Sequence, residues 1–213
     1  MMTPLKRLLD VVGSLVLMVV LSPLILWCVW RILKTDGRPI LYVSERMKTP
    51  TKGFQLLKFR TMTVDDKDAG VSGGDKAHRI TETGRKLRAK RLDELPQLWN
   101  IFKGDISFVG PRPELRRYVE MRPDLFERVL RARPGVTGLA TLVFHKREGE
   151  LLDPCTTPEE TEEVYARRCL PAKARIDMIY AENRNFCYDW QLMFASVFKG
   201  VSVRQSRSKA SDT

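Results

Sequence analysis

The sequence predicts a predominantly helical α+β fold that begins with a broken apolar helix and continues through a small β-hairpin into amphipathic helices. Three observations support this fold class. Residues 11–30 are apolar and uncharged, residues 40–46 and 54–59 are typical of two short strands, and helical segments follow from residue 80 onward.

The composition limits the class of protein. A length of 213 residues fits one domain of ordinary size with an appendage, and 43% hydrophobic residues exclude a mostly disordered chain. The net charge of +11 suits nucleic acid, an anionic membrane or a phosphate-rich substrate. The cysteines form no CxxC pair, so they indicate reduced thiols rather than a zinc site: Cys28, Cys155, Cys169 and Cys187.

The apolar run from Val11 to Trp30 is long enough, at roughly 30 Å, to cross a hydrocarbon core. It is long for a signal peptide, and no small-x-small cleavage site follows it. Ser22-Pro23 interrupts the run and predicts a kink, because proline frees a carbonyl that the serine hydroxyl can bind. Basic residues flank both ends, so the residues themselves leave a kinked spanning helix and a re-entrant helix both open.

The segments after the membrane-like run follow in order. Residues 40–46 and 54–59 predict a hairpin, and the polar, glycine-rich residues 63–79 predict a mobile loop. Residues 80–103 predict a helix interrupted near Pro96. Further helices are expected at 115–121 and 123–132.

The last third of the chain continues this pattern. A turn is expected at 133–138, Thr157 and Pro158 predict a helix start, and a further helix begins at Pro171. Residues 186–201 show one broad apolar face at helical spacing, which indicates either core packing or an interfacial helix.

Asp93 and Glu94 form an adjacent carboxylate pair three and two residues before Pro96. Because proline favours the first turn of a helix, we expect the pair at a helix N-terminus, where phosphate is also welcome. Capping of a surface helix is the plainer interpretation. Nearby cations weaken it, since a carboxylate pair among lysines and arginines can hold Mg²⁺ together with a diphosphate.

Several motifs in this order resemble the bacterial sugar transferases, the monotopic polyprenyl-phosphate phosphoglycosyl transferases. They are KRLLD from Lys6, LSP from Leu21, KFRTM from Lys58, LDELPQLWN from Leu92, GDISFVGPRPE from Gly104 and RPGVTGLA from Arg133. The resemblance covers residues 1 to about 140, and residues 176–183 resemble the tail of the family. The chain departs from the common pattern after Ala140, which leaves sugar selection open.

The resemblance implies a mechanism. Asp93 would be the nucleophile, taking a phospho-sugar from a UDP-sugar, releasing UMP and passing the group to a polyprenyl phosphate, with Asp93 and Glu94 placing Mg²⁺. The break at Ser22 and Pro23 would make the apolar segment a re-entrant membrane helix-break-helix. The expected substrate- and phosphate-binding residues are Lys58, Arg60, Arg88, Pro111, Arg112, Pro113 and Arg133.

The resulting expectation is a re-entrant segment at 1–36, a catalytic domain at 37–203 on the cytoplasmic face of the bacterial inner membrane, and a polar tail at 204–213. Expected partners are the UDP-sugar, the polyprenyl phosphate and the bilayer; a homo-oligomer is left open. Two other classes remain as alternatives: an inactive membrane-anchored scaffold of the same family, and a basic nucleic-acid-binding module, against which the absence of a nucleic-acid motif argues.

Overall fold

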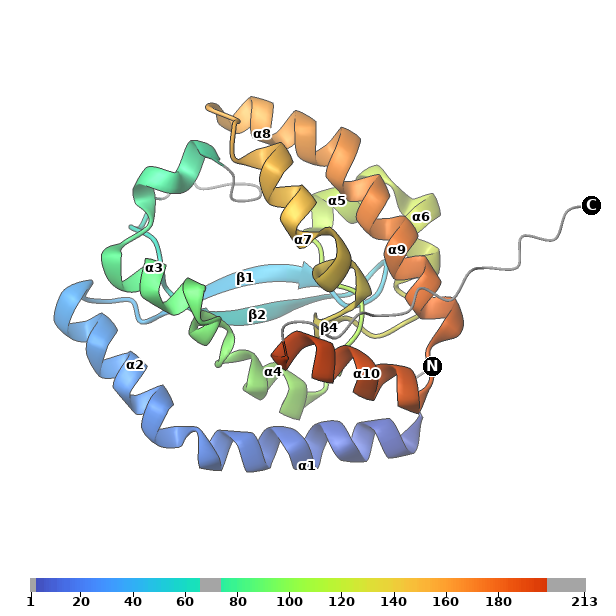
Figure 1. Cartoon of the computed structure of the whole chain (residues 1–213), viewed down its shortest axis with the longest axis horizontal. Coiled ribbons are helices and arrows are strands. Elements are labelled where there is room, and N and C mark those ends of the chain that lie inside the picture. Colours follow the sequence, from blue (N-terminus) through green and yellow to red (C-terminus); the bar gives the residue numbers. More distant parts are fainter. Residues whose placement is uncertain (1–2, 66–73, 199–213) are drawn as a thin grey trace, which may run out of the picture.

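The computed structural model describes residues 3–65 and 74–198 and confirms a predominantly helical α+β fold with a small antiparallel sheet (Figure 1). The hairpin lies at the centre. Helices α1 and α2 run along one side of it, and α7, α8 and α9 lie on the opposite side.

The first two helices are α1 (Pro4–Val20) and α2 (Ser22–Thr35), and they meet at an angle of 62°. Pro23 has no N–H to offer the Val19 carbonyl, and the Ser22 hydroxyl donates to that carbonyl instead at 2.8 Å. The predicted kink is therefore confirmed. Within the described residues no single helix is long and apolar enough to cross a membrane, whereas the bent pair meets that criterion by length and composition.

The hairpin joins β1 (Leu41–Met47) to β2 (Gly53–Phe59), in antiparallel register as predicted. Helix α4 (Gln97–Lys103) packs against β2. The buried Asn100 side chain of α4 donates to the Gln55 carbonyl at 2.7 Å and accepts from the Leu57 N–H at 3.0 Å. Asn100 thus satisfies backbone groups on the open edge of β2, which fixes the strand relative to α4.

A second pair of strands, β3 (Ser107–Val109) and β4 (Gly135–Thr137), is parallel and was not predicted. Three-residue strands carry too little alternation to be distinguished from the turn-rich sequence around them. The turn expected at 133–138 therefore contains β4. Pairing of the two strands brings the loop after Val109 beside the segment that begins at Arg133.

The helices of the C-terminal half enclose the largest cluster of buried apolar side chains. They are α5 (Arg116–Met121), α6 (Pro123–Val129), α7 (Leu139–Leu152), α8 (Pro158–Val164) and α9 (Leu170–Asn183). Thr157 caps α8 as predicted, accepting from the Glu160 N–H at 3.2 Å. A π-helical turn at Tyr165–Cys169 connects α8 to α9, and Pro171 lies in the first turn of α9, so the helix predicted from Pro171 is confirmed.

Helix α10 (Phe186–Val197) confirms the predicted helix, and its apolar face is largely exposed. Phe186, Trp190 and Phe194 are 40–50% exposed, while Leu192, on another face, is fully buried. Core packing is therefore the wrong interpretation for these three aromatic residues. The end of the helix predicted at 186–201 and the polar tail predicted at 204–213 lie outside the described residues.

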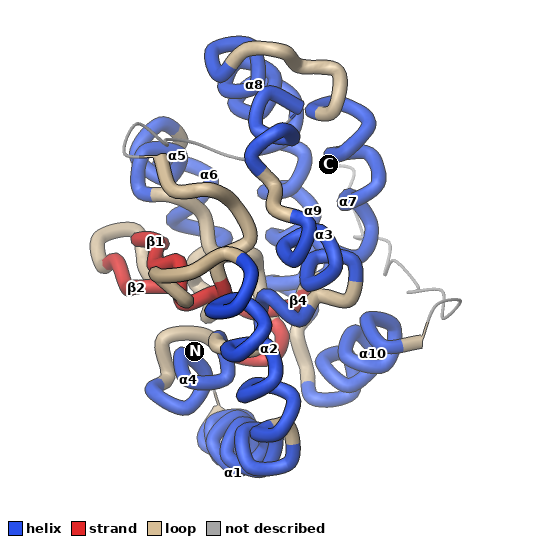
Figure 2. The backbone as a smooth tube through the Cα atoms, turned by 90° about the vertical axis from the view of Figure 1, so that its left-hand side faces the viewer, coloured by secondary structure: helices blue, strands red, loops and turns tan. Residues whose placement is uncertain are grey.

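Figure 2 shows α1 and α10 on the same side of the molecule, away from α8. Lys6 of α1 joins them, since its ammonium group lies 2.6 Å from Asp189 of α10. In the loop predicted at 63–79, residues 66–73 lie outside the described chain and Gly74–Arg79 form a 3₁₀ helix. That part of the loop prediction is wrong.

Candidate active site

Asp93 and Glu94 lie in a short 3₁₀ turn (Leu92–Glu94) between α3 (Glu82–Ala89) and α4. The expectation that they open the helix itself is corrected, because Pro96 is the N-cap of α4 and not a residue of its first turn. The separate turn leaves both carboxylates in front of α4.

Arg91, just before this turn, has a φ of 55°, a backbone conformation that residues other than glycine rarely adopt. Such a residue costs on the order of 1–2 kcal/mol. Its guanidinium group bonds the Glu94 carboxylate at 2.7 Å. The strained backbone thus directs a cation back onto the dyad.

Glu94 is paired at both of its oxygens. Lys58 from β2 lies 3.2 Å and Arg112 lies 3.5 Å from one oxygen, while Arg91 binds the other. Burial alone would raise the pKa of Glu94, but Arg112, Lys58 and Arg91 together lower it to about 2. Glu94 is therefore a fixed negative charge that holds three cations in place.

Asp93 differs from its neighbour, because within the described residues it forms no ion pair. Burial and the nearby Glu94 raise the pKa of Asp93, while Lys58 and Arg88 oppose that rise. A carboxylate with cations close by and no ion pair of its own is suited to attack an electrophile or to bind a metal ion.

Arg88 of α3 approaches Asp93 because α3 lies unusually close to the segment that follows β2. A Cβ at Gly84 would overlap the Thr61 carbonyl, so only glycine permits this approach. The Arg88 Nε group then donates to the Thr61 hydroxyl at 2.9 Å. This bond fixes one side of the guanidinium group and leaves the other directed to the site.

Lys58 is largely buried, and its pKa is lowered to about 8. Burial is the main cause and the neighbouring charge of Arg112 adds to it, while Glu94 and Asp93 act in the opposite direction. Lys58 is thus charged at neutral pH and loses its proton just above it.

The segment Pro111-Arg112-Pro113 is held at each residue. The Pro111 carbonyl accepts from the Gly135 N–H at 2.8 Å, and the Pro113 carbonyl accepts from Arg46 at 3.4 Å. The backbone N–H of Arg112 donates to the buried Asp177 carboxylate. The proline-flanked arginine is therefore firmly positioned beside Glu94.

A buried ionic network next to this segment was missed at the sequence level. Glu114 accepts from the Tyr165 hydroxyl at 2.7 Å, and Lys173 of α9 lies 2.9 Å from Glu114 and 3.0 Å from Glu148. Lys173 and Asp177 are four residues apart on α9 and face the same segment. The signal available beforehand was this i, i+4 pair of opposite charges on one helix.

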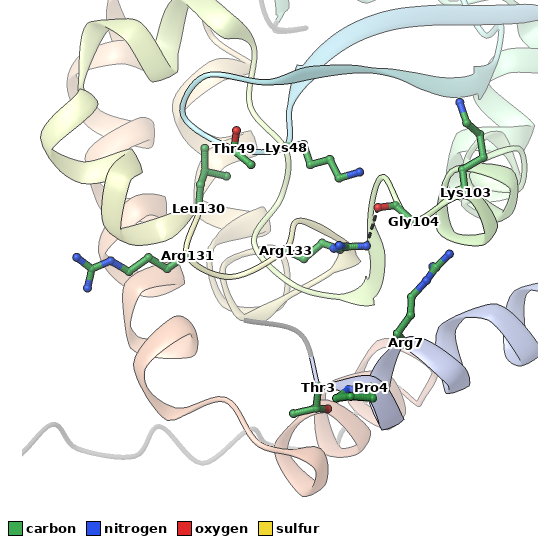
Figure 3. Close-up of a pocket in the computed structure, with 10 residues that line it drawn as sticks. All are labelled: Thr3, Pro4, Arg7, Lys48, Thr49, Lys103, Gly104, Leu130, Arg131 and Arg133. Atoms are coloured by element: carbon green, nitrogen blue, oxygen red, sulfur yellow. Dashed lines mark hydrogen bonds between the residues drawn. The ribbon is translucent and has the colours of Figure 1, made fainter.

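Two expected phosphate-binding residues do not join the cluster around the dyad. Arg60 is buried and donates to the carbonyls of Asp36, Gly37 and Pro39 at 2.6–2.9 Å, so it fastens the end of α2 to the hairpin. Arg133 donates to the Gly104 carbonyl at 2.6 Å, at the far end of α4 (Figure 3). Lys58, Arg88 and Arg112, with its flanking prolines, do lie around the dyad.

The dyad fits Mg²⁺ in part. Mg²⁺ is commonly held by one or two carboxylates together with substrate phosphates and water. Asp93 has the free oxygens for this, whereas both Glu94 oxygens already face cations. No cluster of three or more metal-ligating side chains occurs within residues 3–65 and 74–198. A metal ion here would depend on Asp93 and on the substrate.

Comparison with known proteins gives a consistent result. A family model described as bacterial sugar transferase matches residues 1–203. The UDP-glucose:undecaprenyl-phosphate glucose-1-phosphate transferase of Klebsiella pneumoniae is 29% identical over 199 residues, covering 92% of this chain and 40% of the relative.

Two further relatives are more similar over a shorter range. The UDP-glucose:undecaprenyl-phosphate glucose-1-phosphate transferase of Caulobacter vibrioides is 39% identical over 63% of this chain and 52% of its own length. The undecaprenyl-phosphate galactose phosphotransferase of Salmonella typhimurium is 36% identical over 63% of this chain and 32% of its own length. The chain thus spans about a third to a half of these three relatives.

Proposed function

The chain belongs to the bacterial sugar transferase family, and on that premise we propose that it transfers a phospho-sugar from a UDP-sugar to a polyprenyl phosphate. The proposed acceptor is undecaprenyl phosphate, for which its relatives are named. One observation carries the proposal: among the described residues Asp93 forms no ion pair, whereas Glu94 binds the surrounding cations. The relatives are named for glucose and galactose donors, so the proposed donor class is the UDP-sugar.

In the first proposed step an Asp93 oxygen attacks the β-phosphorus of the UDP-sugar. The bond from that phosphorus to the oxygen bridging the two phosphates breaks, and UMP leaves with the bonding electrons. Asp93 then carries the phospho-sugar as an acyl phosphate. Lys58, Arg88 and Arg112 lie where they would offset the charge of the transferring group.

In the second step a phosphate oxygen of the polyprenyl phosphate attacks the same phosphorus. The bond to Asp93 breaks, the carboxylate is restored, and a polyprenyl diphosphate sugar leaves. When bound, Mg²⁺ would neutralise charge on the diphosphate. We propose Asp93 as its protein ligand, with Glu94 acting indirectly through the three cations it fixes.

We also propose that the bent α1–α2 pair is re-entrant and rests in the cytoplasmic face of the bacterial inner membrane. The 62° break, the exposed apolar residues of α1 and the exposed aromatic face of α10 support this placement. It would bring the dyad to the surface where the acceptor phosphate lies.

Release of UMP tests the reaction. The full chain, with a polyprenyl phosphate and a panel of UDP-sugars, is expected to release UMP, and Asp93→Asn is expected to lower the rate by at least about a thousandfold. Asp124→Asn, on the exposed start of α6, is the matched control and should retain the full rate. Substantial turnover by Asp93→Asn would reject the nucleophile; no turnover by the unaltered chain would favour the inactive scaffold.

Thiol labelling in intact cells tests the placement in the membrane. The exposed Cys187 is first replaced by serine, and Thr3→Cys and Thr51→Cys are then compared. Both sites are expected to react only after the inner membrane is made permeable. Labelling of the two sites from opposite sides would reject a re-entrant helix.

A further inference from the structure

A cavity of about 710 Å³ opens at the end of α4 that is remote from the dyad (Figure 3). The first turn of α1, the hairpin turn between β1 and β2, the end of α4 and the segment before β4 enclose it. Its lining residues are Thr3, Pro4, Arg7, Lys48, Thr49, Lys103, Gly104, Leu130, Arg131 and Arg133. None of these is acidic.

Two arginines converge over Gly104 in this cavity. Arg7 donates to the carbonyls of Ile101 and Phe102, both at 2.7 Å, and Arg133 donates to the Gly104 carbonyl at 2.6 Å. A Cβ added at Gly104 would lie 3.0 Å from Arg7 Nη2 and 3.1 Å from Arg133 Nη1. The two guanidinium groups are therefore held close together by the backbone of one helix end.

The remaining charges do not neutralise this pair. Lys48 and Lys103 share the single carboxylate of Asp105, at 3.4 and 3.7 Å. Burial, followed by the neighbouring charge of Arg7, lowers the pKa of Arg133, while Asp10 and Asp105 act in the opposite direction and offset part of the repulsion between the two guanidinium groups. An anion placed in the cavity would relieve that repulsion and accept the guanidinium N–H groups left over by the three carbonyl bonds.

Capping of the α4 C-terminus explains part of this arrangement, because cations are favourable there. It explains the bonds of Arg7 and Arg133 to the last carbonyls of α4. It does not explain Lys48, which comes from the hairpin turn, or the cavity between these side chains. An excess of cations around an open space favours the binding of an anion.

The surroundings of the cavity indicate what kind of anion this is. Leu5, Leu8 and Val12 lie three and four residues apart on α1, and all are at least half exposed. They begin at the mouth of the cavity, which Thr3 and Pro4 line. The aromatic face of α10 is tied to the same end of α1 through the Lys6–Asp189 pair.

We propose that this cavity binds the phosphate group of an anionic amphiphile, specifically a membrane lipid headgroup, whose acyl chains lie along the exposed face of α1. The site is separate from the dyad, because the seven residues of α4 place roughly 10 Å of helix between them. The headgroup would fix the depth and orientation of α1 at the membrane surface.

Native mass spectrometry of the full chain in maltoside micelles tests the proposal. The micelles are doped with dioleoyl phosphatidylglycerol, with dioleoyl phosphatidylcholine or with inorganic phosphate. Phosphatidylglycerol is expected to bind most tightly, because choline neutralises the other headgroup and inorganic phosphate has no chain. Lys48→Gln with Lys103→Gln is expected to weaken phosphatidylglycerol binding about fivefold to tenfold.

Lys52→Gln is the matched control, since Lys52 is exposed in the same hairpin turn and does not line the cavity. It should bind the lipid as the unaltered chain does. All variants should unfold at the same temperature and release UMP at the same rate, so a failure at the dyad is distinguished from a failure here. Equal lipid binding by the double variant would overturn the site, and equal affinity for inorganic phosphate would overturn the lipid assignment.

Discussion

The two ends of α4 carry two cation clusters that differ in their carboxylates. At the N-terminal end, Lys58, Arg88, Arg91 and Arg112 surround Asp93 and Glu94. At the C-terminal end, five cations line a cavity near the carboxylates of Asp105 and Asp10. Four cations face two carboxylates in the first cluster and five face two in the second, so both clusters are positive and the second is more so.

This difference distinguishes a site that can only bind a phosphate from a site that can also react with it. Cations alone attract a phosphate and can hold it. At the dyad, Glu94 takes up the salt bridges, and Asp93 lies beside the same cations without an ion pair of its own among the described residues. A carboxylate of this kind can react with the phosphate that its neighbours attract.

The largest expected effect is in the buried network of Glu114, Lys173 and Glu148, which lies next to the Pro111-Arg112-Pro113 segment. Lys173→Met should lower the free energy of unfolding by about 3–5 kcal/mol, because it leaves Glu114 buried without its cation. Chemical denaturation measures this. Arg128→Ala, which breaks an exposed pair with Glu182, is the control and should cost about 0–1 kcal/mol. A similarly small loss of unfolding free energy for Lys173→Met would show that the network does not stabilise the Arg112 segment.

The second prediction removes one cation from each cluster. Arg112→Ala should slow UMP release by about a hundredfold to a thousandfold, since Arg112 faces both Glu94 and the proposed transferring phosphate. Arg131→Ala, an exposed cation at the other end of α4, should leave the rate within about twofold. Steady-state kinetics of both variants measures this. An equal fall in the two rates would show that the two cation clusters do not differ in their role in UMP release.

The third prediction concerns pH at the dyad. Lys58 has a pKa lowered to about 8, so its charge is present below that pH and is lost as pH rises through it. UMP release should therefore decline above about pH 8. Lys58→Arg keeps its charge and should move this decline to higher pH, whereas Lys52→Arg should not. An unchanged alkaline limb in Lys58→Arg would remove Lys58 from the reaction.

The sequence predicted those parts of the fold that depend on local pattern. The hairpin follows from two short strand-like runs on either side of a turn-rich segment, and the break at Ser22-Pro23 follows from the chemistry of proline. The strands β3 and β4 are only three residues long, and their pairing depends on contacts between distant segments. Pro171 does lie in the first turn of α9, but the π-helical turn that precedes it was not predicted, because no local pattern distinguishes it.

The site shows the same limit. Lys58 and Arg60 are two residues apart in one motif, and nothing local distinguishes them. Only the tertiary structure turns Lys58 toward Glu94 and buries Arg60 among carbonyls at the end of α2. Likewise, the family resemblance indicated Arg133 for phosphate binding, but the β3–β4 pair carries it to the opposite end of α4.

The smallest expected effect is at Gly104, which ends α4 with a φ of 84°. Gly104→Ala should cost about 1–2 kcal/mol of unfolding free energy, because an alanine is strained in this conformation. Its Cβ would also press on the converging ends of Arg7 and Arg133, so phosphatidylglycerol binding should fall while UMP release in micelles is unchanged. Gly149→Ala is the control: it lies inside α7 with only ordinary contacts and should stabilise the chain by up to about 1 kcal/mol. Loss of UMP release in a Gly104→Ala variant that is still folded at the assay temperature would mean that the two ends of α4 act as one site.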